Sequence, residues 1–189
     1  MSDTPAIAIQ TKSGTLFAQL AKLGDQQVLI FTNGEPAEVP LVRFHSACVF
    51  GEGVRATDCD CGAQLEAAVS AILESGGVIT YAWEEGRGAG IAEKMKAIAL
   101  QQVEGIDTAE AFQKLGHQPE PRNFKNHVAA LQKVFRGGQV RLASANPRKV
   151  EALRRAGIEV VERVLLEIPL PMEREEYLKS KIAALGHLK

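Results

Sequence analysis

The chain has 189 residues, of which 46% are hydrophobic and 24% charged, a composition typical of a soluble globular domain with a sizeable core. Its formal net charge of −1 excludes a global basic field, so we expect neither nucleic acid nor a membrane as a partner. The apolar stretches are short and interrupted, and the first residues do not resemble a signal peptide. We therefore expect a cytoplasmic protein.

The N-terminal part, residues 5–44, is predicted to be rich in β-structure. A strand is expected over 27–32, where it ends at Asn33-Gly34, a pair that favours a tight turn. A further strand is expected over 39–44. Residues 48–62 have neither a helical nor a strand period and are rich in Gly and Asp, which predicts a loop.

From residue 63 onward, helical and strand patterns alternate along the chain. Helices are expected from 63 to the stop at Gly76-Gly77, from 91 to Gly105, from 108 to 115, over 124–135, and from Pro147 to Gly157. Strands are expected over 78–83, 139–144 and 158–166, and a closing helix around 178–185. In the second helix the expected buried face comprises Ile91, Met95, Ile98, Ala99 and Val103.

These elements predict an α/β (α+β) fold. We expect a single domain over residues 1–189, in which a β-rich N-terminal part precedes alternating helices and strands. Its core is expected at about residues 40–165.

The three cysteines of the chain, Cys48, Cys59 and Cys61, lie within fourteen residues. Thiolates bind zinc well, and three protein ligands leave one coordination position for water, as in catalytic zinc sites. His45 is a possible fourth ligand, which would make the site closed and structural. Three buried free cysteines are the alternative that involves no metal, and a disulfide is disfavoured in a reducing compartment.

Two segments between a predicted strand and a predicted helix are candidates for binding phosphate. Residues 85–90 are rich in glycine, which lets the backbone approach a ligand, and Arg87 offers a bidentate contact to phosphate. Residues 144–149 repeat the arrangement after another strand. Ordinary strand-to-helix turns and helix capping remain the alternatives for both.

The order of these motifs resembles the GTP cyclohydrolase II family. The matching runs are residues 42–46, 59–68, 85–87, 99–101, 105–108, 115–116, 146–151 and 161–163. Together they span about residues 40–165. The resemblance implies a GTP cyclohydrolase II-like fold, a homodimer and a purine nucleotide, most readily GTP, as substrate.

The resemblance also implies the chemistry. Zinc on Cys48, Cys59 and Cys61 would activate water for attack on C8 of the purine, and C8 would leave as formate. Pyrophosphate would be lost with Mg²⁺ on the triphosphate, which gives the first intermediate of riboflavin synthesis. The implied catalytic pair is Arg122, which would attack the α-phosphorus or neutralise its charge, and Glu120, its base. The implied substrate-binding residues are Arg43, Phe44, His45, Ser46, Gln64, Glu85, Gly86, Arg87, Thr108, Ser144 and Lys149.

Five positions depart from the family pattern. Ile98 replaces a tyrosine, Glu120 an aspartate, Ala47 a glutamate and Asp58 an arginine, and Trp83 stands where the family tends to be polar. These changes leave open an enzyme that stops at the formamidopyrimidine, or one that acts on a related purine or another nitrogen heterocycle. A non-catalytic protein that binds zinc and nucleotide is a further alternative, as is a cysteine-based redox or metal sensor.

Overall fold

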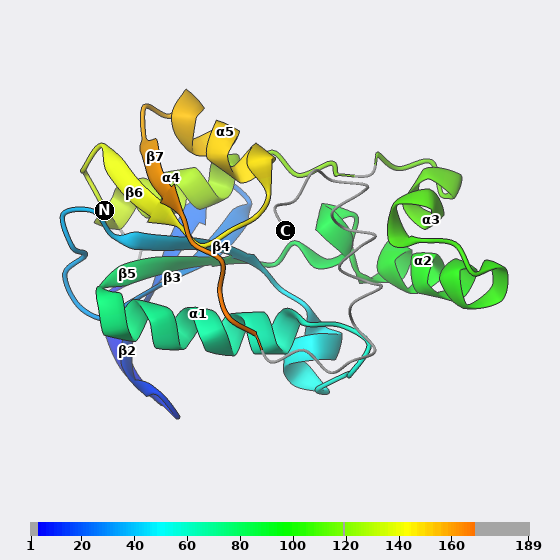
Figure 1. Cartoon of the computed structure of the whole chain (residues 1–189), viewed down its shortest axis with the longest axis horizontal. Helices are drawn as coiled ribbons and strands as arrows, with labels where there is room; N and C mark the ends of the chain where they lie inside the picture. The colour runs from blue at the N-terminus through cyan, green and yellow to red at the C-terminus, as the bar shows by residue number, and fades with distance from the viewer. Residues whose placement is uncertain (1–3, 119, 169–189) are drawn as a thin grey trace.

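The computed structural model describes residues 4–118 and 120–168, and a seven-stranded sheet in the order β1-β2-β3-β5-β4-β6-β7 lies at its centre (Figure 1). β1 (Ile7–Thr11), β2 (Gly14–Leu23) and β3 (Gln26–Thr32) form an antiparallel meander. This meander confirms the β-rich N-terminal part, and β5 (Gly77–Ala82) joins it in antiparallel register with β3.

The other half of the sheet is parallel. β4 (Leu41–Ser46) pairs with β5 on one side and with β6 (Gln139–Leu142) on the other, and β6 pairs with β7 (Glu159–Arg163). β3 and β4 follow each other in the chain, but β5 lies between them in the sheet. The carboxyl ends of β4, β5 and β6 consequently meet at one edge.

Helices cover both faces of the sheet (Figure 1). α1 (Cys61–Ser75) packs on one face, where Ala68 and Ile72 meet Leu41 and Ile79. α4 (Lys125–Val134) and α5 (Pro147–Arg155) cover the opposite face and share a larger core with the strands. This three-layer arrangement confirms the predicted α/β fold.

A pair of helices, α2 (Ile91–Glu104) and α3 (Thr108–Lys114), lies beyond the end of the sheet (Figure 1). The pair has a small core of its own, built from Ala97, Ala111 and Phe112. The predicted buried face of α2 is wrong, because Met95 and Val103 are 57% and 84% exposed. Since α3 packs on the side of Ala97 and Leu100, Ile91, Met95 and Val103 are left outward.

Short helices interrupt the segments that we expected to be loops. η1 (Val49–Gly53) is a π-helical turn after β4, and η2 (Glu85–Gly88) is a 3₁₀ turn after β5. The predicted closing helix at 178–185 lies outside the described residues. Within the ranges that the structure covers, every helix is too short or too polar to span a bilayer.

Candidate functional site

The candidate site lies where the parallel strands end, as expected for an open α/β sheet. Side chains of β4 alternate between its two faces. Arg43 contacts Gln64 of α1, and His45 contacts Glu52 of η1. Phe44 and Ser46 point to the opposite face. The Phe44 ring is fully buried against α4.

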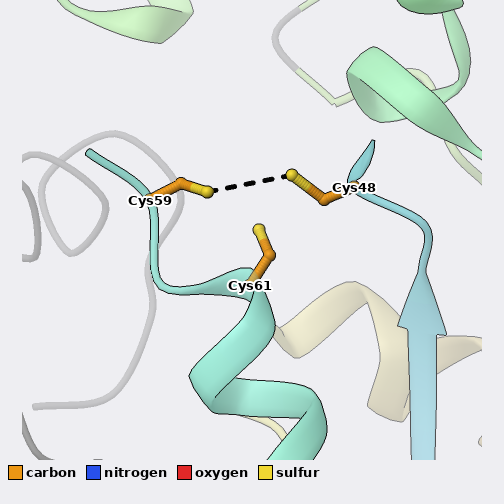
Figure 2. Close-up of side chains that lie close together, drawn as sticks. All are labelled: Cys48, Cys59 and Cys61. Carbon is orange, nitrogen blue, oxygen red and sulfur yellow. Dashed lines mark hydrogen bonds between the residues drawn. The ribbon is translucent and has the colours of Figure 1, made fainter. Parts of the chain in front are cut away.

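The three cysteines converge, as Figure 2 shows. Cys48 follows β4, Cys59 lies in the loop after η1, and Cys61 begins α1. Their sulfur atoms all lie within 4.8 Å of one another, and the Cys48 and Cys59 sulfurs are 3.8 Å apart. The cysteines are free thiols, not disulfide-bonded.

Two glycines make this convergence possible. A Cβ atom added at Gly51 would lie 2.6 Å from the Cys59 sulfur, and one added at Gly62 would lie 2.4 Å from the Gly51 carbonyl oxygen. η1 and the start of α1 therefore touch backbone to backbone, and a side chain at either glycine would separate the segments that carry the thiols.

The electrostatics of the cluster favour a cation. Hydrogen bonds from Cys59 and Cys61, with a further contribution from Lys94, lower the pKa of Cys48. Hydrogen bonds with Cys48 and Cys59, together with burial, raise the pKa of Cys61. Three thiolates held this close would need positive charge to compensate them, of the kind that a soft divalent metal ion supplies.

His45 does not act as a fourth ligand in this arrangement. Its Nε2 lies 2.9 Å from Glu52 Oε1, and its buried Nδ1 has no hydrogen-bond partner. Glu52 also accepts hydrogen bonds from the Cys48 backbone N–H at 2.9 Å and the Tyr81 hydroxyl at 2.7 Å. In the part of the chain that the structure describes, the cluster comprises the three thiols alone.

Lys94 of α2 joins the thiols to the glycine-rich loop. Its ammonium donates to the Cys48 sulfur at 3.1 Å and to Glu85 Oε2 at 2.8 Å. Glu85 also accepts a hydrogen bond from the Val49 backbone N–H. Glu85, a predicted substrate-binding residue, therefore lies directly beside the thiol cluster.

The remaining predicted residues of this loop face the helix pair. Gly86 and Arg87 both adopt left-handed backbone conformations, at φ 58° and 57°, which are costly for arginine. The Arg87 guanidinium lies 5.8 Å from the centre of the Phe112 ring. Thr108 donates to the Gln101 side chain at 2.9 Å and is thus held within the α2–α3 pair.

Buried cations lie beneath the end of β4. Lys149 of α5 donates to the Phe44 carbonyl at 2.6 Å, and burial, followed by repulsion from Arg43 and Arg122, lowers its pKa well below the usual value. Arg43 donates to the Ala143 carbonyl at 2.8 Å and to Gln64 at 2.5 Å. A desolvated guanidinium attracts anionic ligands strongly, and an anion bound beside Lys149 would favour its protonated form.

Glu120 and Arg122 form a bidentate pair. Arg122 Nε and Nη2 lie 2.7 and 2.5 Å from the two Glu120 oxygens, and Nη1 donates to Ser46 Oγ at 3.0 Å. Burial acts to raise the pKa of Glu120, but the hydrogen bonds and charge of Arg122 outweigh it, and the pKa is lowered. Ser144 lies nearby in the chain segment of Asn146, whose backbone N–H it accepts at 3.1 Å.

Four polar side chains at this site were not predicted from the sequence: Glu52, Glu84, Lys94 and His127. Glu84 stands next to the predicted Glu85 but contacts Ser46 and His127, whereas Glu85 contacts Lys94. His127 is fully buried on the apolar face of α4. A histidine among core positions of an amphipathic helix was the available signal, since a buried polar ring requires partners.

Comparison with known proteins identifies the family. The sequence model described as GTP cyclohydrolase II matches residues 4–165. The chain is 43% identical over 173 residues to GTP cyclohydrolase-2 of Cronobacter sakazakii, and 42% and 41% identical to the enzymes of that name from Enterobacter sp. strain 638 and Salmonella typhimurium. Each alignment covers 91% of this chain and 87% of the relative. The chain therefore belongs to the GTP cyclohydrolase II family of hydrolases.

Proposed function

We propose that this protein opens the imidazole ring of GTP by hydrolysis. Formate and pyrophosphate leave, and the product is 2,5-diamino-6-(5-phosphoribosylamino)pyrimidin-4-one, a precursor in riboflavin biosynthesis. The observation that carries the proposal is the cluster of three thiols within 4.8 Å at the strand ends, beside buried cations. A ligand with a hydrolysable ring at one end and phosphates at the other fits this pairing of groups.

Cys48, Cys59 and Cys61 would hold a zinc ion. The donor set fits, because three thiolates are typical zinc ligands and the described residues add no fourth side chain to the group. A zinc ion so held supplies a Lewis acid and lowers the pKa of water enough for hydrolysis near neutral pH. Glu52 fixes the Cys48 backbone, and Lys94 stabilises the thiolate of the same residue.

Glu85 would select guanine. A carboxylate accepts from both the N1–H and the 2-amino group of guanine, whereas adenine offers no matching pair of donors. Lys94 and the Val49 N–H hold Glu85 in place, and each carboxylate oxygen keeps a lone pair for the ligand. Its link to Cys48 through Lys94 would keep the purine next to the metal.

The cations would bind the triphosphate with Mg²⁺. The proposed cationic contacts to the triphosphate are Arg43, Lys149, Arg122 and, from the glycine-rich loop, Arg87. The other proposed contacts to the nucleotide are His45, Ser46, Gln64, Ser144, Gly86, Thr108 and the backbone of Phe44. Because Glu120 is ionised and bound to Arg122, we propose that this pair orients the guanidinium. Arg122 then neutralises charge at the α-phosphate while a water molecule displaces pyrophosphate from the α-phosphorus.

We also propose that the protein is a homodimer. Ile91, Met95 and Val103 of α2 are 40%, 57% and 84% exposed, and a second copy would cover apolar side chains that this chain leaves outward. Light scattering would give the mass, and Val103→Glu should convert the dimer to a monomer if α2 lies in the interface.

The experiment that tests the function is incubation of the zinc-loaded protein with GTP and Mg²⁺, with formate, pyrophosphate and product mass recorded together. We expect both small products in equal amounts, and no formate from a Cys59→Ser variant. GMP and ATP serve as comparison substrates. A product that retains the mass of the formyl group would instead support ring opening without deformylation, and bound GTP without turnover would refute the proposal.

A further inference from the structure

A continuous line of hydrogen bonds runs from the interior of the sheet to Arg122. It begins at Thr80, a fully buried residue of β5, whose Oγ1 lies 2.8 Å from His127 Nδ1. His127 Nε2 lies 3.3 Å from Glu84 Oε2. The imidazole thus connects a strand to a carboxylate at the edge of the candidate site.

The second half of the line reaches the guanidinium. The Ser46 hydroxyl lies 2.9 Å from Glu84 Oε2, the same oxygen that contacts His127. Ser46 Oγ in turn lies 3.0 Å from Arg122 Nη1. Since Glu120 holds the other two nitrogens of Arg122, Ser46 is what holds the third.

The donors and acceptors allow only one direction for the hydrogen bonds along this line. Burial acts to raise the pKa of Glu84, but hydrogen bonds from His127 and Ser46 and the charge of Arg122 lower it on balance, so this carboxylate only accepts. His127 Nε2 therefore carries a proton, its Nδ1 accepts from Thr80, and the Ser46 hydroxyl proton points to Glu84. A lone pair of Ser46 is thereby turned toward Arg122.

Aromatic packing fixes the imidazole at the centre of this line. The ring of His127 stacks on Phe44 with centroids 5.0 Å apart and planes at 15°, and the ring of Phe124, the residue before α4, lies 6.1 Å away. Phe124 is buried in a left-handed conformation, φ 58°, a strained backbone of the kind that functional sites retain. The fully buried imidazole is therefore packed between two aromatic rings.

We propose that Glu84 and His127 are positioning residues of the proposed reaction. They hold the Ser46 hydroxyl in the one orientation that fixes Arg122 Nη1, so that the guanidinium is aimed before the nucleotide binds. This inference rests on the proposed function, in which Arg122 faces the phosphates. It predicts that pyrophosphate release depends on an acceptor at position 84, although residue 84 does not itself contact the α-phosphate.

The test uses substitutions that separate the acceptor from the volume of the side chain. Glu84→Met fills similar space without an acceptor, whereas Glu84→Gln can place an oxygen where Oε2 lies. We expect Glu84→Met to lower kcat for pyrophosphate release by about 10- to 100-fold, with the KM for GTP nearly unchanged and zinc content intact. Glu84→Gln should restore most of the rate.

A double variant of His127 and Glu84 provides a second test of whether the two residues act together. His127→Leu and Glu84→Met interrupt the same line, so the double variant should be no slower than Glu84→Met alone, whereas independent effects would multiply. Thr32→Val, another buried threonine on the neighbouring strand β3, is the control for buried substitutions. It should leave the rate within about twofold of the unmodified protein.

Nitrogen NMR separates this inference from the proposed function. In the unmodified protein His127 should appear as the tautomer protonated at Nε2, and Glu84→Met should shift both this signal and those of Arg122, even if GTP proves not to be the substrate. Three results would overturn the inference. Glu84→Met could release pyrophosphate as fast as Glu84→Gln, or the rate losses of His127→Leu and Glu84→Met could multiply in the double variant. The third is that the His127 and Arg122 signals stay unchanged in Glu84→Met. A failure of the proposed function alone appears as an unmodified protein that is inactive on GTP while these signals shift as expected.

Discussion

Replacing Gly51 by alanine should abolish tight zinc binding through one methyl group. Neither Gly51 nor Gly53 has a positive φ, so alanine meets no backbone strain at either position. At Gly51, however, the new Cβ would lie 2.6 Å from the Cys59 sulfur and 3.1 Å from the Cys61 Cβ. Ordinary contacts of this kind are about 3.5–4.0 Å, so the thiols must move by roughly 1 Å.

A movement of this size exceeds what a zinc site accepts, because metal–sulfur distances vary by only about 0.2 Å. We expect Gly51→Ala to weaken zinc affinity by about 100-fold, or roughly 2.8 kcal/mol. Gly53→Ala, in the same turn, places its Cβ 3.5 Å from a Val49 methyl and should bind zinc normally.

The assay is zinc per chain by mass spectrometry, followed by competition with a chromophoric chelator. Thermal unfolding with and without EDTA should show a metal-dependent increase in Tm for the unmodified protein and for Gly53→Ala only. Equal zinc affinities for the two alanine variants would refute the claim that backbone contact between η1 and α1 assembles the site.

Three further predictions concern the surroundings of the metal site. Lys94→Met removes the ammonium 3.1 Å from the Cys48 sulfur. The reaction of that thiol with iodoacetamide in the metal-free protein should therefore slow by about tenfold, and an unchanged rate would contradict the claim that Lys94 stabilises the Cys48 thiolate. Arg122→Lys keeps the charge but loses the bidentate contact with Glu120, and pyrophosphate release should fall by about 100-fold while zinc content stays normal; a rate near that of the unmodified protein would remove Arg122 from the mechanism. Burial lowers the pKa of His127, so the unfolded chain takes up this proton first as the pH falls below about 6.5, and the free energy of unfolding decreases on acidification. His127→Leu should make that decrease shallower, by at most about 1.4 kcal/mol per pH unit, as urea titrations from about pH 7.5 to about pH 5 would measure.

The sequence predicted the elements of the sheet better than their arrangement. The strand that ends at Asn33-Gly34 and the helix that begins at residue 108 appear as expected, because both depend on local backbone chemistry, at the helix a capping box formed by Asp107. The insertion of β5 between β3 and β4 depends on pairing between distant segments, which no local pattern encodes. The buried face of α2 was mispredicted because Ala97 and Leu100, which we did not place on it, are the side chains that pack in the core shared with α3.

The candidate site shows the same division. The cysteine spacing identified a group that the structure brings within 4.8 Å, since three thiols near one turn have few alternatives to a shared ion. Glu84 and His127 could not be paired from the sequence, because they lie 43 residues apart and on different elements. The turn from β5 into η2 sends Glu84 to His127 of α4 and Glu85 to Lys94 of α2, contacts that depend on where these helices pack.

The separate core of the α2–α3 pair implies that the protein can lose its activity without losing its fold. Heat or mild denaturant should loosen this pair first, since its few buried side chains are not continuous with those beneath the sheet. Lys94 would then leave Cys48, while the three thiols stay anchored to η1 and α1. The sheet and its metal site would then stay folded while α2 and α3 detach. Faster amide hydrogen exchange in residues 91–114 than in β4 and β5 would reveal this state.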